Sequence, residues 1–297
     1  MILAQISDPH IVAPGKLFRG PVQGTAPEAE RIVVEFDTAP YLMRAVAALS
    51  ALAPRPDVVV VTGDLVDHGE PAEYEHLRAL LAPLAMPVFV IPGNHDAREP
   101  LRAAFRGDGY LPAAGWLQYA VEDYPLRLVA LDTLIEGQPG GTLCAERLGW
   151  LDRILAARPN RPTAILMHHP PFATGITYMD RCRLDSSAAL ADIVARHPQV
   201  ERILCGHLHR AIDRRFAGSV AGTAPATAHQ IRLNLVPEAR LNFVFEPPGY
   251  QLHLWHDHAS LVTHTALFGD WPPPSLPRGL ERMAQASGPE ANGPGTR

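Results

Sequence analysis

The chain has 297 residues, of which 47% are hydrophobic and 19% charged, and these values are typical of one large or two modest globular domains. The net charge of -5 argues against a stable nucleic-acid partner, because phosphate backbones require clustered Lys and Arg. The first residues do not resemble a signal peptide, and no apolar run is long enough to cross a membrane. The three cysteines are too widely spaced to suggest a disulfide framework, so we predict a cytoplasmic protein without membrane insertion.

Short β-branched runs alternate with amphipathic helical patterns along the first two thirds of the chain. The predicted strands are residues 2–7, 57–62, 87–91, 127–132, 162–167 and 200–205. The predicted helices are residues 38–53, 71–85, 145–157 and 186–197. Such alternation predicts a layered α/β domain built on a mostly parallel or mixed sheet.

One early segment departs from this alternation. Residues 11–36 show no clear period and are interrupted by Pro and Gly. A loop of this length inside a compact domain is usually functional. The segment also begins beside the first chemical motif, so we expect it to form a wall or lid of the active site.

The pattern changes again after residue 210. Short strands are predicted at 211–216, 241–246, 249–256 and 259–267, and they suggest a second, antiparallel sheet packed against the first. From about residue 271 the chain is rich in Pro and Gly and poor in apolar residues. We therefore predict one domain over residues 1–270, in which 210–268 supply the C-terminal strands of the second sheet, and a disordered tail over 271–297.

Five short polar motifs each follow the end of a predicted strand. Loops at the carboxyl ends of strands carry the sites of open α/β sheets, so the five motifs are expected in one cleft. Side chains at positions i and i+2 of an extended backbone point the same way, so both members of D-x-H or H-x-H could reach one metal cluster. The motifs are Asp8-Pro9-His10, Gly63-Asp64, Gly93-Asn94-His95-Asp96, His168-His169-Pro170-Pro171 and Gly206-His207-Leu208-His209.

The residue types in these motifs indicate the class of metal. Carboxylates, one amide oxygen and several imidazoles, without Cys, suit two divalent ions of Mn, Fe, Co or Zn. They do not suit an all-oxygen Mg or Ca cage. A carboxylate such as Asp64 can bridge two ions, which together can clamp a phosphoryl group during in-line displacement.

The ordered set D-x-H, G-D, G-N-H-D, H-H-P-P and G-H-L-H resembles the calcineurin-like metallophosphoesterases. Within them it is similar to the class III cyclic-nucleotide phosphodiesterases and the related glycerophosphodiesterases, from Met1 to about residue 268. The resemblance implies an α/β fold, a four-layer α-β-β-α sandwich with two packed mixed sheets. It also implies a homodimer or higher homo-oligomer, to which the C-terminal strands often contribute.

The resemblance also implies a role for each matching residue. Asp8, His10 and His209 would hold one metal, Asn94, His168 and His207 the second, and Asp64 would bridge them. His95 would face the substrate phosphate and assist departure of the leaving group, and Asp67 is a candidate to orient it. The substrate-binding set would be Asn94, His95, His209 and His229, the last from the segment Thr227-Ala228-His229-Gln230.

The remaining residues of interest favour structural roles. His169 would point away from His168 if both lay on a strand, and Asp96 is expected to be structural. A C-terminal group of histidines lacks a matching carboxylate, so no metal role is predicted for it. Its members are His253, His256, His258 and His264.

These observations favour hydrolysis of a small phosphodiester by a metal-bridging hydroxide, with 3′,5′-cyclic nucleotides such as cAMP as the first substrate hypothesis. A glycerophosphodiesterase or broad-specificity phosphodiesterase is the main alternative. A phosphomonoesterase, a nucleotide pyrophosphatase and a catalytically dead binding protein are less favoured. The last would be expected to have lost ligands, whereas all seven ligand positions are filled.

Overall fold

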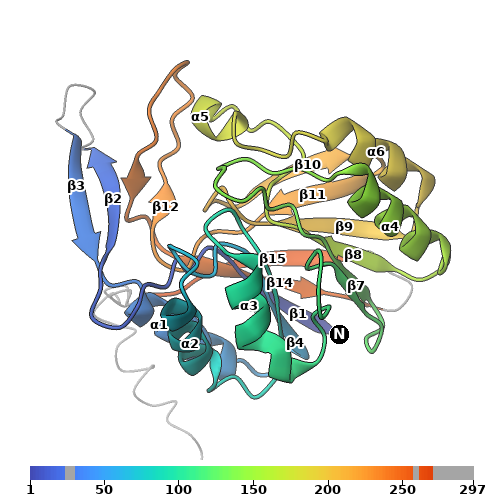
Figure 1. Cartoon of the computed structure of the whole chain (residues 1–297), viewed down its shortest axis with the longest axis horizontal. Coiled ribbons are helices and arrows are strands. Elements are labelled where there is room, and N and C mark those ends of the chain that lie inside the picture. Colours follow the sequence, from blue (N-terminus) through green and yellow to red (C-terminus); the bar gives the residue numbers. More distant parts are fainter. Residues whose placement is uncertain (24–30, 257–260, 270–297) are drawn as a thin grey trace, which may run out of the picture.

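Two mixed β-sheets lie face to face at the centre of the molecule, with helices on their outer faces (Figure 1). The computed structural model describes residues 1–23, 31–256 and 261–269. The first sheet has the order β15-β14-β1-β4-β5 and the second the order β10-β11-β9-β8-β7-β6. The strands of the first sheet are β1 (Ile2–Ile6), β4 (Val58–Thr62), β5 (Val88–Ile91), β14 (Gly249–Leu254) and β15 (Val262–Leu267). Those of the second are β6 (Tyr119–Val121), β7 (Arg127–Ala130), β8 (Thr163–Leu166), β9 (Val200–Cys205), β10 (Ile212–Phe216) and β11 (Ser219–Thr223).

Neighbouring parallel strands form the main part of each sheet, and antiparallel pairing occurs at both sides of the second sheet but at only one side of the first, where β5 is a parallel edge strand. β1, β4 and β5 run parallel, as do β7, β8, β9 and β11. β14 pairs antiparallel with β1, and β6 and β10 are antiparallel edge strands. The carboxyl ends of the parallel strands therefore lie at one edge of each sheet, as the position of the site requires.

Helices cover the outer faces of both sheets. In the first, Leu42, Leu77 and Leu101 pack onto the sheet from three helices. In the second, Leu151 and Leu190 do the same from two helices. The helices are α1 (Ala39–Ser50), α2 (Pro71–Leu81) and α3 (Arg98–Phe105) on the first sheet and α4 (Ala145–Ala156) and α6 (Ser187–Arg196) on the second, with a 3-10 turn η1 (Arg106–Asp108) and the short α5 (Thr177–Asp180).

The central strands are buried on both faces, which explains their nearly continuous apolar sequences. In β4, Val58 and Val60 point into the core between the two sheets, while Val59 and Val61 point toward the helices. β8 shows the same alternation, with Leu166 in the central core and Ile165 under α4 and α6. The predicted four-layer α-β-β-α sandwich is confirmed.

Residues 11–36 are not a single loop, so the prediction of one long loop was wrong. They contain β2 (Phe18–Gln23) and β3 (Arg31–Phe36), an antiparallel pair. With β12 (Gln230–Ile231) and β13 (Phe243–Val244) these strands form a third sheet in the order β12-β13-β2-β3. Figure 1 shows this third sheet standing beside the two main sheets, close to α5.

The C-terminal strands do not form one antiparallel second sheet, and this prediction also needs correction. β10 and β11 extend the second sheet, β12 and β13 belong to the third, and β14 and β15 extend the first. The choice of partner depends on pairings between distant parts of the chain, such as Leu3 with His253, which local patterns do not encode.

Two further expectations concern a membrane span and the C-terminal residues. Among the described residues, none of the helices is both long and apolar enough to traverse a bilayer. The predicted tail, 271–297, and His258 lie outside the described residues.

Candidate active site

The five polar motifs converge at the carboxyl ends of β1, β4, β5, β8 and β9. Backbone hydrogen bonds connect the loops that carry them. The amide of Asp8 donates to Gly63 O at 3.2 Å, and that of His10 donates to Asp64 O at 3.0 Å. The amide of Gly206 donates to His168 O at 3.0 Å. These bonds fix neighbouring loops within each sheet. The two sheets are joined at this edge by the bond from His168 Nδ1 to Thr62 O at 2.8 Å and by the His207 amide, which donates to Asp8 Oδ1 at 3.0 Å.

The backbone of this edge is unusual. Five of the candidate ligands have positive φ angles, although none of them is a glycine. Non-glycine residues rarely adopt this conformation, and such strain clusters at functional sites. It also corrects the expected geometry, because the D-x-H and H-x-H pairs converge through left-handed turns and not through the alternation of an extended strand. The angles are 51° at Asp8, 45° at His10, 46° at Asp64, 71° at His207 and 49° at His209.

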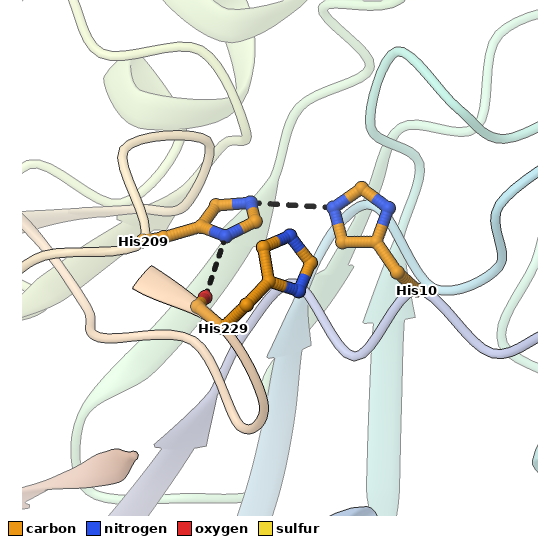
Figure 2. Close-up of side chains that lie close together, drawn as sticks. All are labelled: His10, His209 and His229. Carbon is orange, nitrogen blue, oxygen red and sulfur yellow. Dashed lines mark hydrogen bonds between the residues drawn. The ribbon is translucent and has the colours of Figure 1, made fainter. Parts of the chain in front are cut away.

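The first half of the ligand set brings two imidazoles and two carboxylates together. Figure 2 shows that His10 and His209 point toward each other, with 3.2 Å between their Nε2 atoms. His209 Nε2 lies 3.4 Å from Asp8 Oδ1, and His10 Nε2 lies 3.6 Å from Asp64 Oδ2. The ligand atoms of all four residues lie within 4.8 Å of one another.

Outer hydrogen bonds decide which imidazole nitrogens face this centre. His209 Nδ1 donates to the carbonyl oxygen of His229 at 2.9 Å, and His10 Nδ1 lies 3.2 Å from Asp67 Oδ1. Because a carbonyl and a carboxylate only accept, these bonds place the protons on Nδ1. The lone pairs of both Nε2 atoms then face each other, an arrangement that a cation would stabilise.

The second half is built around His168 and Asn94. His168 Nε2 lies 3.2 Å from Asn94 Oδ1 and 3.3 Å from Asp64 Oδ2, while its Nδ1 is bonded to Thr62 O at 2.8 Å. His207 Nε2 is buried and has no hydrogen-bond partner. Asp64 Oδ2 therefore lies between imidazoles of the two halves, where a bridging carboxylate is required.

The protonation states of most candidate ligands fit a divalent metal. His168 is the exception, because Asp64 outweighs burial and raises its pKa to about 9, so a metal would have to displace its proton. Burial lowers the pKa of His10 and lowers that of His207 to about 3, so both are neutral. Burial alone would raise the pKa of Asp8 and Asp64, but nearby imidazoles, His209 and His168 respectively, outweigh it and lower both. Neutral imidazoles and ionised carboxylates are the forms that bind metals. The unpartnered His207 nitrogen and this donor set thus fit a pair of intermediate divalent ions.

His95 stands beside the ligand set with a different environment. Its side chain is 39% exposed, its backbone amide donates to Asp64 Oδ1 at 2.9 Å, and its Nδ1 lies 2.9 Å from Asp67 O and 3.3 Å from Asp67 Oδ1. Burial opposes a charge on this imidazole, but Asp64 and Asp67 outweigh it and raise its pKa to about 10. Asp67 contacts both His10 and His95, and its own pKa is lowered by these imidazoles despite burial. His95 is therefore a positively charged donor at the edge of the centre.

Asp96 has the structural position that its sequence context predicts. It is buried and accepts hydrogen bonds from the amides of Gly93 at 2.8 Å and Leu65 at 3.1 Å and from the Tyr74 hydroxyl at 3.0 Å. It therefore fixes the turn that presents Asn94 and His95.

Two other histidines, His169 and His229, contact the ligand set. The ring of His169 does not point away from the site as expected, because the H-H-P-P segment follows β8 and is not itself a strand. It packs 4.7 Å from the ring of His207, with its Nδ1 2.8 Å from Thr133 Oγ1. His229 lies beside His10 and His209 in Figure 2, stacks on Phe18 at 4.4 Å, and is fully buried with neither ring nitrogen hydrogen-bonded.

Two hollows meet at Asn94, His95 and Pro139. A cavity of about 170 Å³, the aromatic cavity, reaches the ligand set. An open groove of about 500 Å³ adjoins it at the three shared residues. The aromatic cavity is also lined by Phe18, Tyr178, Met179, Ile231, Leu241 and Phe243, and the open groove by Asp67, His68, Glu136 and Gln138. Apart from Asp67, which was a candidate to orient His95, no motif identified these lining residues, and Phe18 fell in a segment expected to form a wall.

Comparisons with known proteins agree with this site. The chain belongs to the calcineurin-like phosphoesterase family, whose model matches residues 1–211. It is 35% identical to a probable glycerophosphodiester phosphodiesterase of Arcobacter nitrofigilis, over 92% of this chain and 96% of the relative. It is also 35% identical to a probable cyclic nucleotide phosphodiesterase of Rhodopseudomonas palustris, over 89% of this chain and 91% of the relative. The motif-based resemblance is confirmed.

A solved structure shows the same fold. The dimetal phosphatase from Danio rerio matches with a TM-score of 0.59 and 16% identity, over 89% of this chain and 98% of that one. At this identity the likeness concerns the arrangement of sheets and helices alone.

Proposed function

We propose that this protein is a two-metal phosphodiesterase that hydrolyses small phosphodiesters. The observation that carries the proposal is the convergence of seven ligand-type side chains beside His95, whose Nδ1 lies 3.3 Å from Asp67 Oδ1. Membership of the calcineurin-like phosphoesterases and the names of the relatives support the same class of reaction.

Each ligand has a position in the proposed centre. Asp8, His10 and His209 would hold one divalent ion, Asn94, His168 and His207 would hold the other, and Asp64 would bridge them. The ligand chemistry favours Mn, Fe, Co or Zn. When bound, two such ions supply the nucleophile by lowering the pKa of water, and they neutralise charge on the phosphoryl oxygens.

The chain itself supplies the proton for the leaving group. His95 lies where the two hollows meet, so its imidazolium can donate a proton to the ester oxygen that departs. Asp67, 3.3 Å from His95 Nδ1, orients the ring and preserves its charge. The aromatic side chains of Phe18 and Phe243 exclude water from one side of the centre.

The two hollows indicate which class of phosphodiester the site can accommodate. A phosphodiester has two ester substituents, and the aromatic cavity and the open groove meet at His95. This arrangement suits an acyclic diester, such as a glycerophosphodiester, with the retained group in the cavity and the leaving alcohol in the groove. Cyclic nucleotides are the second candidate, because the Rhodopseudomonas palustris relative bears that name.

A turnover screen of Mn-loaded protein tests the proposal. The substrates are bis-p-nitrophenyl phosphate, p-nitrophenyl phosphate, 3′,5′-cyclic AMP, 2′,3′-cyclic AMP and glycerophosphoethanolamine. We expect diester turnover that chelation abolishes and that Mn restores, and the ranking chooses between the two substrate classes. Activity confined to the monoester would contradict the proposal.

Oligomeric state and compartment are further parts of the proposal. Apolar side chains on β3 and on the segment between β12 and β13 are exposed and suit an interface between two copies of the chain. Light scattering should show a homodimer or higher homo-oligomer, and Val33→Glu should weaken it. Cell fractionation should place the protein in the cytoplasm. The exposed side chains are Ile32, Val33, Leu233, Leu235 and Val236.

A further inference from the structure

A chain of buried hydrogen bonds leads away from the candidate ligand Asp8. Ser7 Oγ donates to Asp8 Oδ2 at 2.5 Å, and Thr62 Oγ1 donates to Ser7 Oγ at 2.7 Å. Gln5 Nε2 donates in turn to Thr62 Oγ1 at 2.9 Å. All four side chains are fully buried, so each bond is made in a low-dielectric environment.

The chain continues to His253 on β14, which pairs with β1. His253 Nε2 lies 3.0 Å from Gln5 Oε1, and its Nδ1 lies 2.8 Å from Thr263 Oγ1. Since the amide oxygen of Gln5 can only accept, His253 carries its proton on Nε2 and accepts from Thr263 on Nδ1. Its complete burial, which lowers its pKa to about 3, keeps the ring neutral and preserves this pattern.

The direction of every bond follows from Gln5. Its Nε2 also donates to the carbonyl oxygen of Cys205 at 2.9 Å, so the amino end of the amide must face Cys205 and Thr62. Thr62 then accepts from Gln5 and has its proton free for Ser7, which has its proton free for Asp8. All donors therefore point toward Asp8, an order in which each bond polarises the next.

The consequence is a fixed orientation of the Asp8 carboxylate. Oδ2 accepts from Ser7, and the amide of His207 lies 3.0 and 3.1 Å from the two oxygens. Oδ1 is directed toward His209 Nε2, 3.4 Å away, where a metal would be held. If the Gln5 amide were reversed, Thr62 would donate to Gln5 instead of Ser7, and the order of the chain would be lost.

We propose that His253 is a positioning residue for Asp8, which it orients through Gln5, Thr62 and Ser7. This inference rests on the proposed function in that Asp8 is taken as a metal ligand. His253 belongs to the C-terminal histidines for which the sequence predicts no metal role, and it acts here without touching a metal. Groups bonded directly to a metal ligand, as Ser7 is to Asp8, commonly change metal affinity by about 10- to 100-fold, so we expect the lower end of this range for His253 at the far end of the chain.

The test is the affinity of the metal-free protein for Mn²⁺, measured by calorimetry. His253→Leu removes the donor to Gln5 and should weaken Mn²⁺ binding about 10-fold. His253→Gln restores an N–H at a similar position and should bind within about twofold of the wild type. KM for a diester should be unchanged in both at saturating Mn²⁺, because neither variant alters the substrate cavities.

A matched pair of threonine variants controls for general destabilisation of the protein. Thr62→Val breaks the chain without changing the side-chain shape and should weaken Mn²⁺ binding like His253→Leu, which covers the case in which the latter fails to fold. Thr163, on β8, has another fully buried hydroxyl, which donates to Arg161 O at 2.8 Å. Thr163→Val removes this hydroxyl and should leave the affinity for Mn²⁺ unchanged.

The outcomes separate this inference from the proposed function. Wild-type affinity in folded His253→Leu and Thr62→Val, or an equal loss in Thr163→Val, would overturn the positioning role. Wild-type protein that binds Mn²⁺ but hydrolyses no diester would contradict the phosphodiesterase proposal, while a selective loss in His253→Leu would still support the positioning role. Wild-type protein that binds no Mn²⁺ would overturn both.

Discussion

The ligand set and the third sheet border the same cavity but are built in opposite ways. The ligands follow strands such as β1, β4 and β8, whose residues are largely inaccessible to solvent on both faces. The third sheet consists of β2 and β3 with two strands of two residues each, and side chains such as Ile32 and Val33 are more than half exposed. The ligand set is thus anchored in three hydrophobic cores, and the cavity wall is not.

This difference separates two tasks. Metal ligands must be held accurately, and they lie on a scaffold that also tolerates left-handed turns at five of them. The wall needs only to define the shape and polarity of the space beside the metals. We therefore expect variants in the ligand set to change the rate of the reaction and variants in the wall to change the choice of substrate.

The strongest test concerns the ligand set. Asn94→Ala removes the amide oxygen that lies 3.2 Å from His168 Nε2. Loss of a metal costs several kcal/mol of transition-state stabilisation, so kcat/KM for bis-p-nitrophenyl phosphate should fall by at least about 10³-fold. His207→Ala should behave similarly. Circular dichroism should show an intact fold, and substantial turnover in either variant would contradict the two-metal assignment.

His95 provides a sharper test, because its role depends on the leaving group. General acid catalysis contributes about 10²- to 10⁴-fold, so His95→Ala should lose activity in this range toward an alkyl diester such as glycerophosphoethanolamine. The loss should be much smaller with p-nitrophenolate as leaving group, since this anion departs without a proton. His264→Ala, an exposed histidine on β15, is the control and should resemble the wild type. Equal losses on both substrates would exclude proton donation by His95.

Much of the ligand set is predictable from sequence because it depends on local order. Each motif directly follows a β-branched run, and strand ends of a layered α/β domain meet at one edge. The sequence alone therefore places Asp8, Asp64 and His168 in one cleft. The way in which Asp8 and His10 converge could not, because left-handed backbone at non-glycine residues is imposed by surrounding contacts.

The sequence indicated that residues 11–36 border the site, but the third sheet that forms the cavity wall could not be predicted, because it depends on pairing between distant segments. Phe243 on β13 pairs with Val22 on β2, far away in the sequence. β12 and β13 are too short to produce a periodic hydrophobic pattern. β2 contains Gly20 and Pro21, which are rare in strands and favour the prediction of a loop. The same reason explains why β14 and β15 were expected in a different sheet.

The wall should affect selectivity more than rate. Tyr178→Ala, on α5, enlarges the aromatic cavity without touching a candidate ligand. The ratio of kcat/KM for a diester with a bulky retained group to that for one with a small retained group should rise about 10-fold. Mn²⁺ affinity should be unchanged. Phe245→Ala, 49% exposed and outside this cavity, is the control. An unchanged ratio would mean that the retained group does not occupy this cavity.

The smallest expected effect concerns His253, at the far end of the buried hydrogen-bond chain that leads from Asp8. His253 has a folded-state pKa of about 3, because burial disfavours its charged form. In the unfolded chain a histidine titrates near pH 6.5, so the unfolded state binds more protons between these values and stability falls as the pH falls. Between pH 7 and pH 6 this residue should account for a loss of about 0.7 kcal/mol in the free energy of unfolding.

Urea unfolding of metal-free protein at the two pH values measures this loss. His253→Gln lacks the titrating group, so its stability should fall less than that of the wild type over the same interval, while contributions from the other histidines cancel in the difference. Identical losses would show that His253 is not held neutral by the fold. A neutral ring accepts from Thr263 at Nδ1, whereas a protonated ring would donate to it. Because Nε2 donates to Gln5 in both forms, the pH measurement tests the burial of His253, and the Mn²⁺ affinities test the orientation of Asp8.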